Sequence, residues 1–335
     1  AYEASAQELA ATHLITAEKC SKILASREKD YPQKLQAFCE NNGVAILTTA
    51  DSNYPLQLKN IENPPSVLYV KGTLPDTDEA VGVIGSRKST SYGLKVAGTF
   101  AQDLALAGLT IISGGARGID TAAHKGALKA NGKTIAVLGC GIDVIYPYEN
   151  ADLFKQISKI GAIITEFPPG AEPLAKNFPA RNRIISGFSQ GILVVEAARK
   201  SGAMITAEFA IDEGREVYCI PGSIFSPTSV GTHSLIKQGA KLVQRPEDIL
   251  EDFHLLLQKQ PKEKCDMPDL FSGMSEDCEI VTNKILTVLN FNEAKTLEEI
   301  VTASALPLNV ISSVLLNLQV NGYVAEQIGK RYIRL

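Results

Sequence analysis

The sequence predicts an α/β fold built around a doubly wound parallel sheet. Short, β-branched and nearly all-apolar runs recur between residues 80 and 244, and amphipathic segments of helical length separate several of them. Strands that are apolar throughout are typical of a parallel sheet that helices cover on both faces. In such a fold, ligands bind at the carboxyl ends of the strands.

The predicted elements follow in order along the chain. Residues 44–71 carry three prolines and are expected to be irregular and extended, apart from a strand at VLYV. The predicted strands cover residues 67–70, 80–84, 109–113, 134–139, 161–166, 191–196, 216–221 and 240–244. The predicted helices between them cover residues 92–108, 118–132 and 203–214.

The flanks have a different character. Residues 1–48 predict three short helices, the last of which stops at Gly43, and therefore a small N-terminal helical domain before a central domain at 49–253. Residues 254–277 mix prolines with charges and predict a linker. Residues 278–335 predict three helices and a hairpin turning at Gly329 and Lys330, which is the pattern of a C-terminal winged-helix domain.

Composition excludes several classes of function. The chain has 335 residues, a net charge of −4 and 45% hydrophobic residues, so a general nucleic-acid binder is not indicated, although one basic face can still exist. Six cysteines without a CxxC pair, and histidines without HExxH spacing, predict no metal and no redox site. We expect reduced thiols and a cytoplasmic location, since no signal peptide and no bilayer-length apolar run are present.

The first candidate site is the stretch GSRKSTSYG after the strand at 80–84. Gly85, Ser86 and Arg87 fall at the carboxyl end of this strand, where the fold places ligands. Ser89 or Thr90 can cap the next helix. A capped turn with an exposed arginine explains the pattern equally well.

The second candidate is the glycine-rich loop SGGARG, which opens the helix expected at 118–132. Loops of this kind leave N–H groups free at a helix N-terminus for an anion, and Arg117 adds a bidentate phosphate donor. A dinucleotide site would need G-x-G-x-x-G and an acid after the next strand, and a P-loop would need Gly-Lys-Ser/Thr. Both are absent, so we expect an anion site without a cofactor, at Ser113, Gly114, Gly115, Arg117 and Gly118.

The third candidate, KNFPARNRII, places Lys176, Arg181 and Arg183 around Phe178, with Asn182 among them. Cations interleaved with a ring suit single-stranded nucleic acid, because the cations bind phosphates while the ring stacks on a base. The alternative is a solvated, positively charged helix start with the phenylalanine in the core.

The fourth candidate is Arg199 with Lys200, which follows the strand at 191–196; Glu196 is an alternative, local ion-pair partner. Three basic clusters thus follow strand ends. We expect them to share one rim of the sheet, and this convergence carries more weight than any single motif.

Five motifs in this order resemble the DprA/Smf family of bacterial DNA-processing proteins. They are GSRKSTSYG, SGGARGIDTAAH, NFPARNRIISG, VVEAARKSGAMITA and PGSIFSPTSVGTHSLIKQGA, within residues 53–253. The resemblance implies an extended Rossmann-like domain between a SAM-like helical domain and a winged helix. It implies a non-catalytic dimer, joined through the Rossmann-like domain, that binds and protects single-stranded DNA and loads RecA onto it during natural transformation.

The resemblance also implies site residues and one departure. The family's phosphate-binding G-[ST]-R motif falls on residues 85–87, its glycine-rich loop on 114–118 and its FPxRNR segment on 178–183. The family commonly has Asn where this chain has His233, which affects local detail at that edge. The predicted last helix, 306–322, carries no Lys or Arg, so the winged helix favours a protein contact over reading of duplex DNA.

Two alternatives remain open at this point. A nucleotide phosphoribohydrolase of the lysine-decarboxylase-like (LOG) family joins a glycine-rich loop to PGGxGTxxE, whose glutamate is catalytic. Here an insertion separates Pro221-Gly222 from Gly231-Thr232, and Leu235 stands at the glutamate position. The other alternative is a scaffold protein whose phosphate site binds a small nucleotide.

Overall fold

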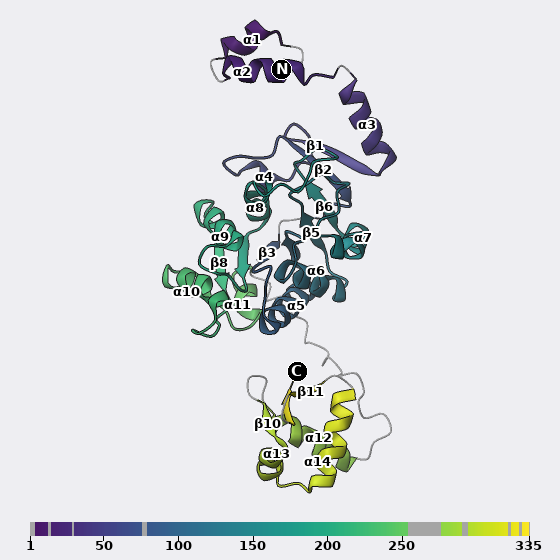
Figure 1. Cartoon of the computed structure of the whole chain (residues 1–335), viewed down its shortest axis with the longest axis vertical. Helices are drawn as coiled ribbons and strands as arrows, with labels where there is room; N and C mark the ends of the chain where they lie inside the picture. The colour runs from purple at the N-terminus through teal and green to yellow at the C-terminus, as the bar shows by residue number, and fades with distance from the viewer. Residues whose placement is uncertain are drawn as a thin grey trace. The chain divides into compact units, whose positions relative to one another are not determined.

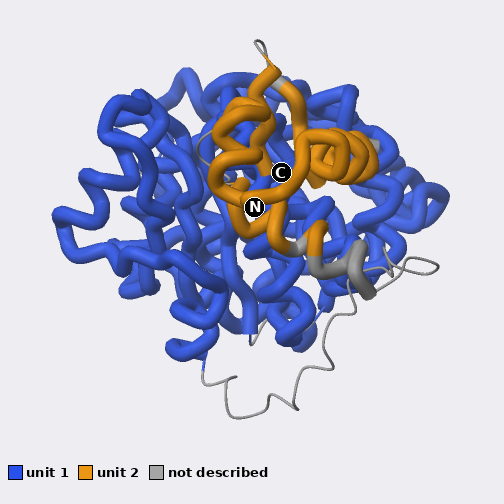
Figure 2. The backbone as a smooth tube through the Cα atoms, turned by 90° about the horizontal axis from the view of Figure 1, so that it is seen from below, with its two compact units in different colours: residues 1–259 blue, residues 260–335 orange. Residues whose placement is uncertain are grey.

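A computed structural model describes residues 4–12, 15–28, 30–75, 79–253, 276–289, 294–320, 323–327 and 330–334. The chain divides into two compact units, residues 1–259 and 260–335, which Figure 2 colours separately. The first unit includes the predicted N-terminal helices, and the predicted linker falls mostly on residues outside the described ranges.

The first unit is built on a nine-stranded sheet in the order β1-β2-β6-β5-β4-β3-β7-β8-β9. The seven strands from β6 to β9 in that order are mutually parallel, whereas β1 and β2 join their edge antiparallel. Figure 1 shows β3 near the middle of the sheet, with α5 and α6 beside it. The strands are β1 (Val44–Thr48), β2 (Val67–Gly72), β3 (Ala80–Ile84), β4 (Thr110–Ser113), β5 (Thr134–Val137), β6 (Ala162–Thr165), β7 (Gly191–Val194), β8 (Glu216–Cys219) and β9 (Lys241–Leu242).

The helices of this unit cover the predicted segments and several that were not predicted. They are α1 (Ala6–Ala11), α2 (Ala17–Ala25), α3 (Tyr31–Asn41), α4 (Leu56–Lys59), α5 (Ser91–Leu106), α6 (Ile119–Lys129), α7 (Ala151–Ile160), α8 (Asn177–Phe188), α9 (Gly202–Asp212), α10 (Val230–Lys237) and α11 (Glu247–Leu250). Two 3-10 turns, η1 (Tyr148–Asn150) and η2 (Pro227–Ser229), lie in the connections.

Alternation along the buried strands divides the core into two layers. Val81 and Val83 of β3 pack with α5 and α6 on one face, while Ala80 and Ile84 pack with α8 and α9 on the other. Both sets are apolar because helices cover both faces, which is why these strands lack a polar side. The predicted doubly wound, Rossmann-like sheet is therefore confirmed.

The predicted strands are all present, some shorter than expected, and one further strand was missed. Residues 44–48, expected to belong to an irregular, extended stretch, form β1 and pair with residues 67–71 of β2. The predicted domain boundary at residue 48 thus falls at the end of a strand of the large sheet. The short run VAILT is followed by polar and turn-forming residues, and its pairing partner β2 lies farther along the chain, at residues 67–71. The local sequence therefore did not indicate the pairing.

Among its described residues, the second unit contains three helices and a three-stranded antiparallel sheet. They are α12 (Glu276–Val288), α13 (Leu297–Ser304), α14 (Leu308–Val320), β10 (Lys295–Thr296), β11 (Val324–Gln327) and β12 (Arg331–Arg334). The predicted helices and hairpin are present; Lys330 has a left-handed φ of 55°, and Gly329 lies outside the described residues. The winged-helix assignment itself stays a prediction.

Within the described ranges, no single helix is long and apolar enough to cross a membrane; only the bent pair of α13 and residues 308–319 meets that length and composition together.

A buried histidine in α6 makes the first unit sensitive to acid. His124 is fully buried, and its Nδ1 lies 2.7 Å from Thr134 Oγ1, which itself donates to Ile111 O. Since the hydroxyl proton is used, Nδ1 carries the imidazole proton, and the buried Nε2 has no hydrogen-bond partner in the described chain. Burial lowers the pKa of His124 to about 3.

We expect His124 to cost stability below neutral pH. An unfolded histidine binds a proton below about pH 6.5, while the folded one does not until about pH 3. Stability is therefore lost as the pH falls through this window, and the loss is about 2 kcal/mol between pH 7 and pH 5. Urea unfolding of wild type and His124→Gln at both pH values measures it. Parallel losses in the two proteins, or an imidazole NMR signal that titrates near pH 6.5, would contradict the assignment.

Candidate functional site

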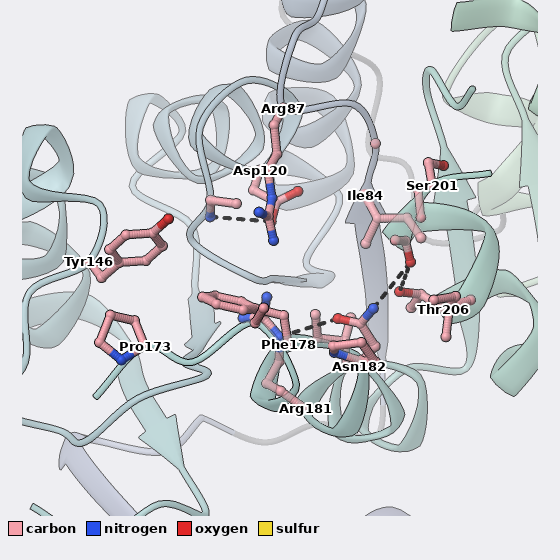
Figure 3. Close-up of a pocket in the computed structure, with 18 residues that line it drawn as sticks. Ile84, Arg87, Asp120, Tyr146, Pro173, Phe178, Arg181, Asn182, Ser201 and Thr206 are labelled. Atoms are coloured by element: carbon pink, nitrogen blue, oxygen red, sulfur yellow. Dashed lines mark hydrogen bonds between the residues drawn. The ribbon is translucent and has the colours of Figure 1, made fainter. Parts of the chain in front are cut away.

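A cavity of about 500 Å³ lies at the carboxyl ends of the central strands (Figure 3). Its wall is supplied by the turn after β3, the loop after β4, the segment before η1, and the first turns of α8 and α9. The lining residues used below are Arg87, Ala116, Asp120, Tyr146, Phe178, Arg181, Asn182, Ser201, Gly202 and Ala203. The cavity therefore occupies the position that this fold reserves for ligands.

The glycine-rich loop is bonded tightly to the turn after β3. Ser113 Oγ donates to Val83 O at 2.7 Å, and Ile119 N donates to Ser86 O at 3.3 Å. Gly118 has φ +78°, and a Cβ there would collide with the Ser86 carbonyl oxygen. Glycine is needed at this position for both reasons, and the two predicted phosphate motifs consequently form one structural unit.

Arg181 anchors α8 to the same loop from inside. Its side chain is buried, at 3% exposure, and its Nη1 donates to Gly114 O at 2.7 Å and to Val137 O. A Cβ on Gly114 would lie 2.6 Å from Arg181 Nη2 and 2.7 Å from Asp120 Oδ2, so only glycine fits between these groups. Arg181 was predicted to bind DNA phosphate; the structure places its guanidinium in the wall, bonded to main-chain carbonyls.

Burial moves the pKa of both charged groups in this wall. Burial raises the pKa of Asp120 to about 6, and the positive charge of Arg181 opposes that rise. Burial lowers the pKa of Arg181 to about 10, opposed by the Asp120 carboxylate. Asp120 also accepts a 3.3 Å hydrogen bond from Ala116 N, as Figure 3 shows. The wall therefore holds a buried carboxyl group with a raised pKa close to a buried cation.

Arg87, Phe178 and Tyr146 form a stack of one cation and two rings. The Arg87 guanidinium carbon lies 4.9 Å from the Phe178 centroid, and the Tyr146 and Phe178 centroids are 5.6 Å apart with the rings tilted by 50°. In Figure 3, Arg87 points toward the ring from the opposite side of the cavity. Phe178 rests on Gly139, where a Cβ would meet its ring at 3.0 Å. Phe178 is half-buried, so its ring is available to the cavity rather than lost in the core.

The N-terminus of α9 adds polar groups to the opposite wall. Ser201 precedes this helix, yet its side chain makes no cap, and its buried Oγ has no hydrogen-bond partner in the described chain. Asn182 Nδ2 donates to Gly202 O at 3.1 Å and fixes the helix start against α8 (Figure 3). The first N–H groups of a helix have no intrahelical acceptor, so this wall offers donors to a ligand.

The remaining predicted residues do not line the cavity. Arg183 is paired with Glu166 through two contacts of 2.7 and 2.6 Å and donates to Asn63 O, beside a separate hollow of about 230 Å³. Arg117 is exposed but donates twice to Glu149. Lys176, Arg199 and Lys200 are exposed. The structure therefore brings Arg87 and Ala116 of the glycine-rich loop to the cavity, whereas Arg183 faces a different hollow.

Several lining residues were absent from the predicted set, among them Tyr146, Asp120 and Ser201. Tyr146 lies beyond a turn after β5, Asp120 was taken only as part of a helix start, and Ser201 as part of a strand exit. The only local signal for the Tyr146 ring was its place in IYPYEN, shortly after a buried strand.

Glu196, the predicted alternative partner of Arg199, instead accepts hydrogen bonds from Thr90 N at 2.9 Å and from Thr90 Oγ1 at 2.5 Å.

Comparison with known proteins agrees with this geometry. The family model described as DNA recombination-mediator protein A matches residues 45–254. Protein Smf of Synechocystis is 36% identical over 93% of this chain and 86% of its own length. Protein Smf of Escherichia coli K12 is 42% identical over 86% of this chain and 77% of its own.

Solved structures give the same answer. The X-ray structure of DNA processing protein A from Streptococcus pneumoniae has a TM-score of 0.66 and 38% identity, covering 75% of this chain and 87% of that one. A structure of the Helicobacter pylori protein, described for its single-stranded DNA binding mode, has a TM-score of 0.57 and 29% identity, covering 63% and 95%. The family model spans more than half of the sequence and its motifs build one cavity, so this chain belongs to the DNA recombination-mediator protein A family, the DprA/Smf proteins.

Proposed function

We propose that this protein is a single-stranded DNA-binding recombination mediator whose cavity takes one nucleotide of the strand. The observation that carries the proposal is the stack of Arg87, Phe178 and Tyr146 beside the glycine-rich loop. A ring can stack on any base and a neighbouring cation can bind the adjoining phosphate, which is how proteins hold single strands without reading sequence. The Helicobacter pylori relative, described for binding single-stranded DNA, supports the same ligand here.

The proposal extends to what the family resemblance implies. Protection of incoming DNA, loading of RecA, a role in natural transformation, a homodimer through the Rossmann-like domain and a cytoplasmic location all stay predictions. Membership of the DNA recombination-mediator family supports a role in DNA processing as the common ground of these predictions.

A non-catalytic role is favoured over a nucleotide phosphoribohydrolase. Leu235, at the position of the catalytic glutamate, is an apolar core residue with 2% exposure. Glu196 is buried and accepts hydrogen bonds from Thr90. Asp120, and not Glu196, is the carboxylate among the lining residues of the cavity. Release of free base from a nucleoside monophosphate, lost in Asp120→Asn, would establish the enzyme instead. Binding of a mononucleotide in competition with DNA, without mediator activity, would establish the small-effector alternative.

Removing the Phe178 ring and removing the Arg87 cation should each weaken DNA binding, but in different ways. Phe178→Ala should raise the Kd for labelled polythymidine about 5- to 150-fold, since one base stack contributes about 1–3 kcal/mol. Arg87→Ala should also reduce the slope of log K against log salt by about 0.7, one phosphate contact. Fluorescence anisotropy at several salt concentrations measures both. Lys155→Ala, which removes an exposed lysine of α7 paired with Asp152, is the matched control; an equal effect in the control would refute the assignment.

Arg87 and Arg181, the two arginines that contact the Phe178 ring, should differ in how much each contributes to the stability of the fold. Arg181→Met leaves the Gly114 and Val137 carbonyls without the guanidinium donor and removes the positive charge near Asp120, so we expect a loss of about 3 kcal/mol in the free energy of unfolding. Arg87→Ala should change it by less than about 0.5 kcal/mol, because Arg87 is exposed. Urea unfolding compares them. A stable Arg181→Met protein that had lost only DNA affinity would reassign Arg181 to phosphate binding.

A further inference from the structure

We propose a second nucleotide step beside the cavity, in which the Tyr148 ring stacks on the neighbouring base and Arg117 binds its phosphate in exchange for Glu149. The proposal rests on the proposed function, since it extends the path of the same strand. It gives a role to three residues, Arg117, Tyr148 and Glu149, that do not line the cavity.

The path from the cavity to Tyr148 is short and continuous in the chain. Tyr146 contacts Phe178 inside the cavity and is itself 39% exposed. Tyr148 follows two residues later and is 80% exposed, whereas the intervening Pro147 is buried. A ring with so little of its surface covered contributes little to the core, and large exposed rings of this kind are typical of binding surfaces.

The segment that carries Tyr148 is held firmly. Tyr148 begins the 3-10 turn η1, and Asn150 at its end is buried. Asn150 Nδ2 donates to Gly115 O at 3.0 Å and to Thr121 Oγ1 at 2.8 Å. The turn is thereby bonded to the glycine-rich loop and to α6. A ring presented on such a fixed turn loses little conformational entropy when a base stacks on it.

The ion pair of Arg117 and Glu149 joins the same two segments. Arg117 Nε and Nη2 donate to one carboxylate oxygen of Glu149 at 3.1 and 2.6 Å. The side chains are 60% and 61% exposed, so the pair is a surface ion pair that contributes little to stability. The carboxylate occupies the donors that a phosphate would use, and a phosphate forms charge-assisted bonds with the same guanidinium fork.

Glu149 therefore acts as a built-in competitor for the second phosphate. Binding of the strand must displace a carboxylate that remains nearby, which lowers the net gain from the Arg117 contact. Removing the carboxylate's charge frees Arg117 without removing any group that contacts the DNA. A conservative substitution outside the cavity, Glu149→Gln, should therefore increase the affinity for DNA rather than decrease it.

The test compares four single variants by anisotropy with labelled polythymidine of about 20 nucleotides at several salt concentrations. Tyr148→Ala should raise the Kd about 5- to 150-fold, as expected for one base stack. Its control, Leu106→Ala, removes an exposed apolar side chain from the end of α5. This helix end leads into the amino end of β4, whereas the cavity lies at the carboxyl ends of the strands. The control should change the Kd less than 2-fold.

Glu149→Gln should lower the Kd about 2- to 5-fold, because the phosphate no longer has to displace a carboxylate from Arg117. Its control is Asp152→Asn, which removes an equal charge from the start of α7, where Asp152 pairs with Lys155 at 3.0 Å. The gain in Glu149→Gln should vanish when Arg117→Ala is added.

The outcomes separate the two proposals. If Arg87→Ala and Phe178→Ala weaken binding while Tyr148→Ala matches Leu106→Ala, or Glu149→Gln matches Asp152→Asn, the second step is wrong and the cavity stands. If wild type does not bind polythymidine, or if Arg87→Ala and Phe178→Ala bind as tightly as wild type, the proposed function fails and the second step fails with it.

Discussion

The architecture of the cavity depends on one buried guanidinium. Arg181 reaches from α8 to the carbonyl oxygens of Gly114 and Val137, at the ends of β4 and β5, and so fixes the helix against the carboxyl edge of the sheet. Phe178 lies three residues earlier on the same helix, on the same face, and is placed over the cavity by that anchor. The retained charge is compensated by Asp120 and by main-chain dipoles, as a buried cation requires.

The arginines of the predicted basic clusters therefore have different physical roles. Arg181 is buried and structural, Arg183 is held by Glu166 and Asn63, and Arg87 is exposed with its guanidinium over a ring. Counting positive charges near strand ends would treat them alike. Burial and hydrogen-bond partners decide which of them can exchange a protein partner for a phosphate, since a guanidinium that is buried with its partner loses more than it gains by doing so.

The glycines of the site matter for close approach more than for flexibility. Gly118 adopts a left-handed φ and touches the Ser86 carbonyl, while Gly114 separates Arg181 from Asp120 with no room for a methyl group. Together they allow the two loops to approach each other closely and leave room for the buried Arg181 and Asp120 side chains beside them. The cavity is consequently held by close contacts within the first unit, and Tyr146 brings the segment before η1 into its lining.

The sequence by itself determined the class of fold, most of the strands and the position of the site. Apolar runs such as 80–84 and 191–196 have the length and the continuous apolar character of strands in a sheet that is buried on both faces. The motifs that follow these runs lie at the carboxyl ends of the strands because of the topology of such a sheet. Tertiary structure alone decided that β1 joins the sheet, that Arg181 turns inward while Arg87 remains exposed, and that Tyr146 meets Phe178. These outcomes depend on contacts between residues 20 to 70 positions apart, and local propensity carries no information about such distant partners.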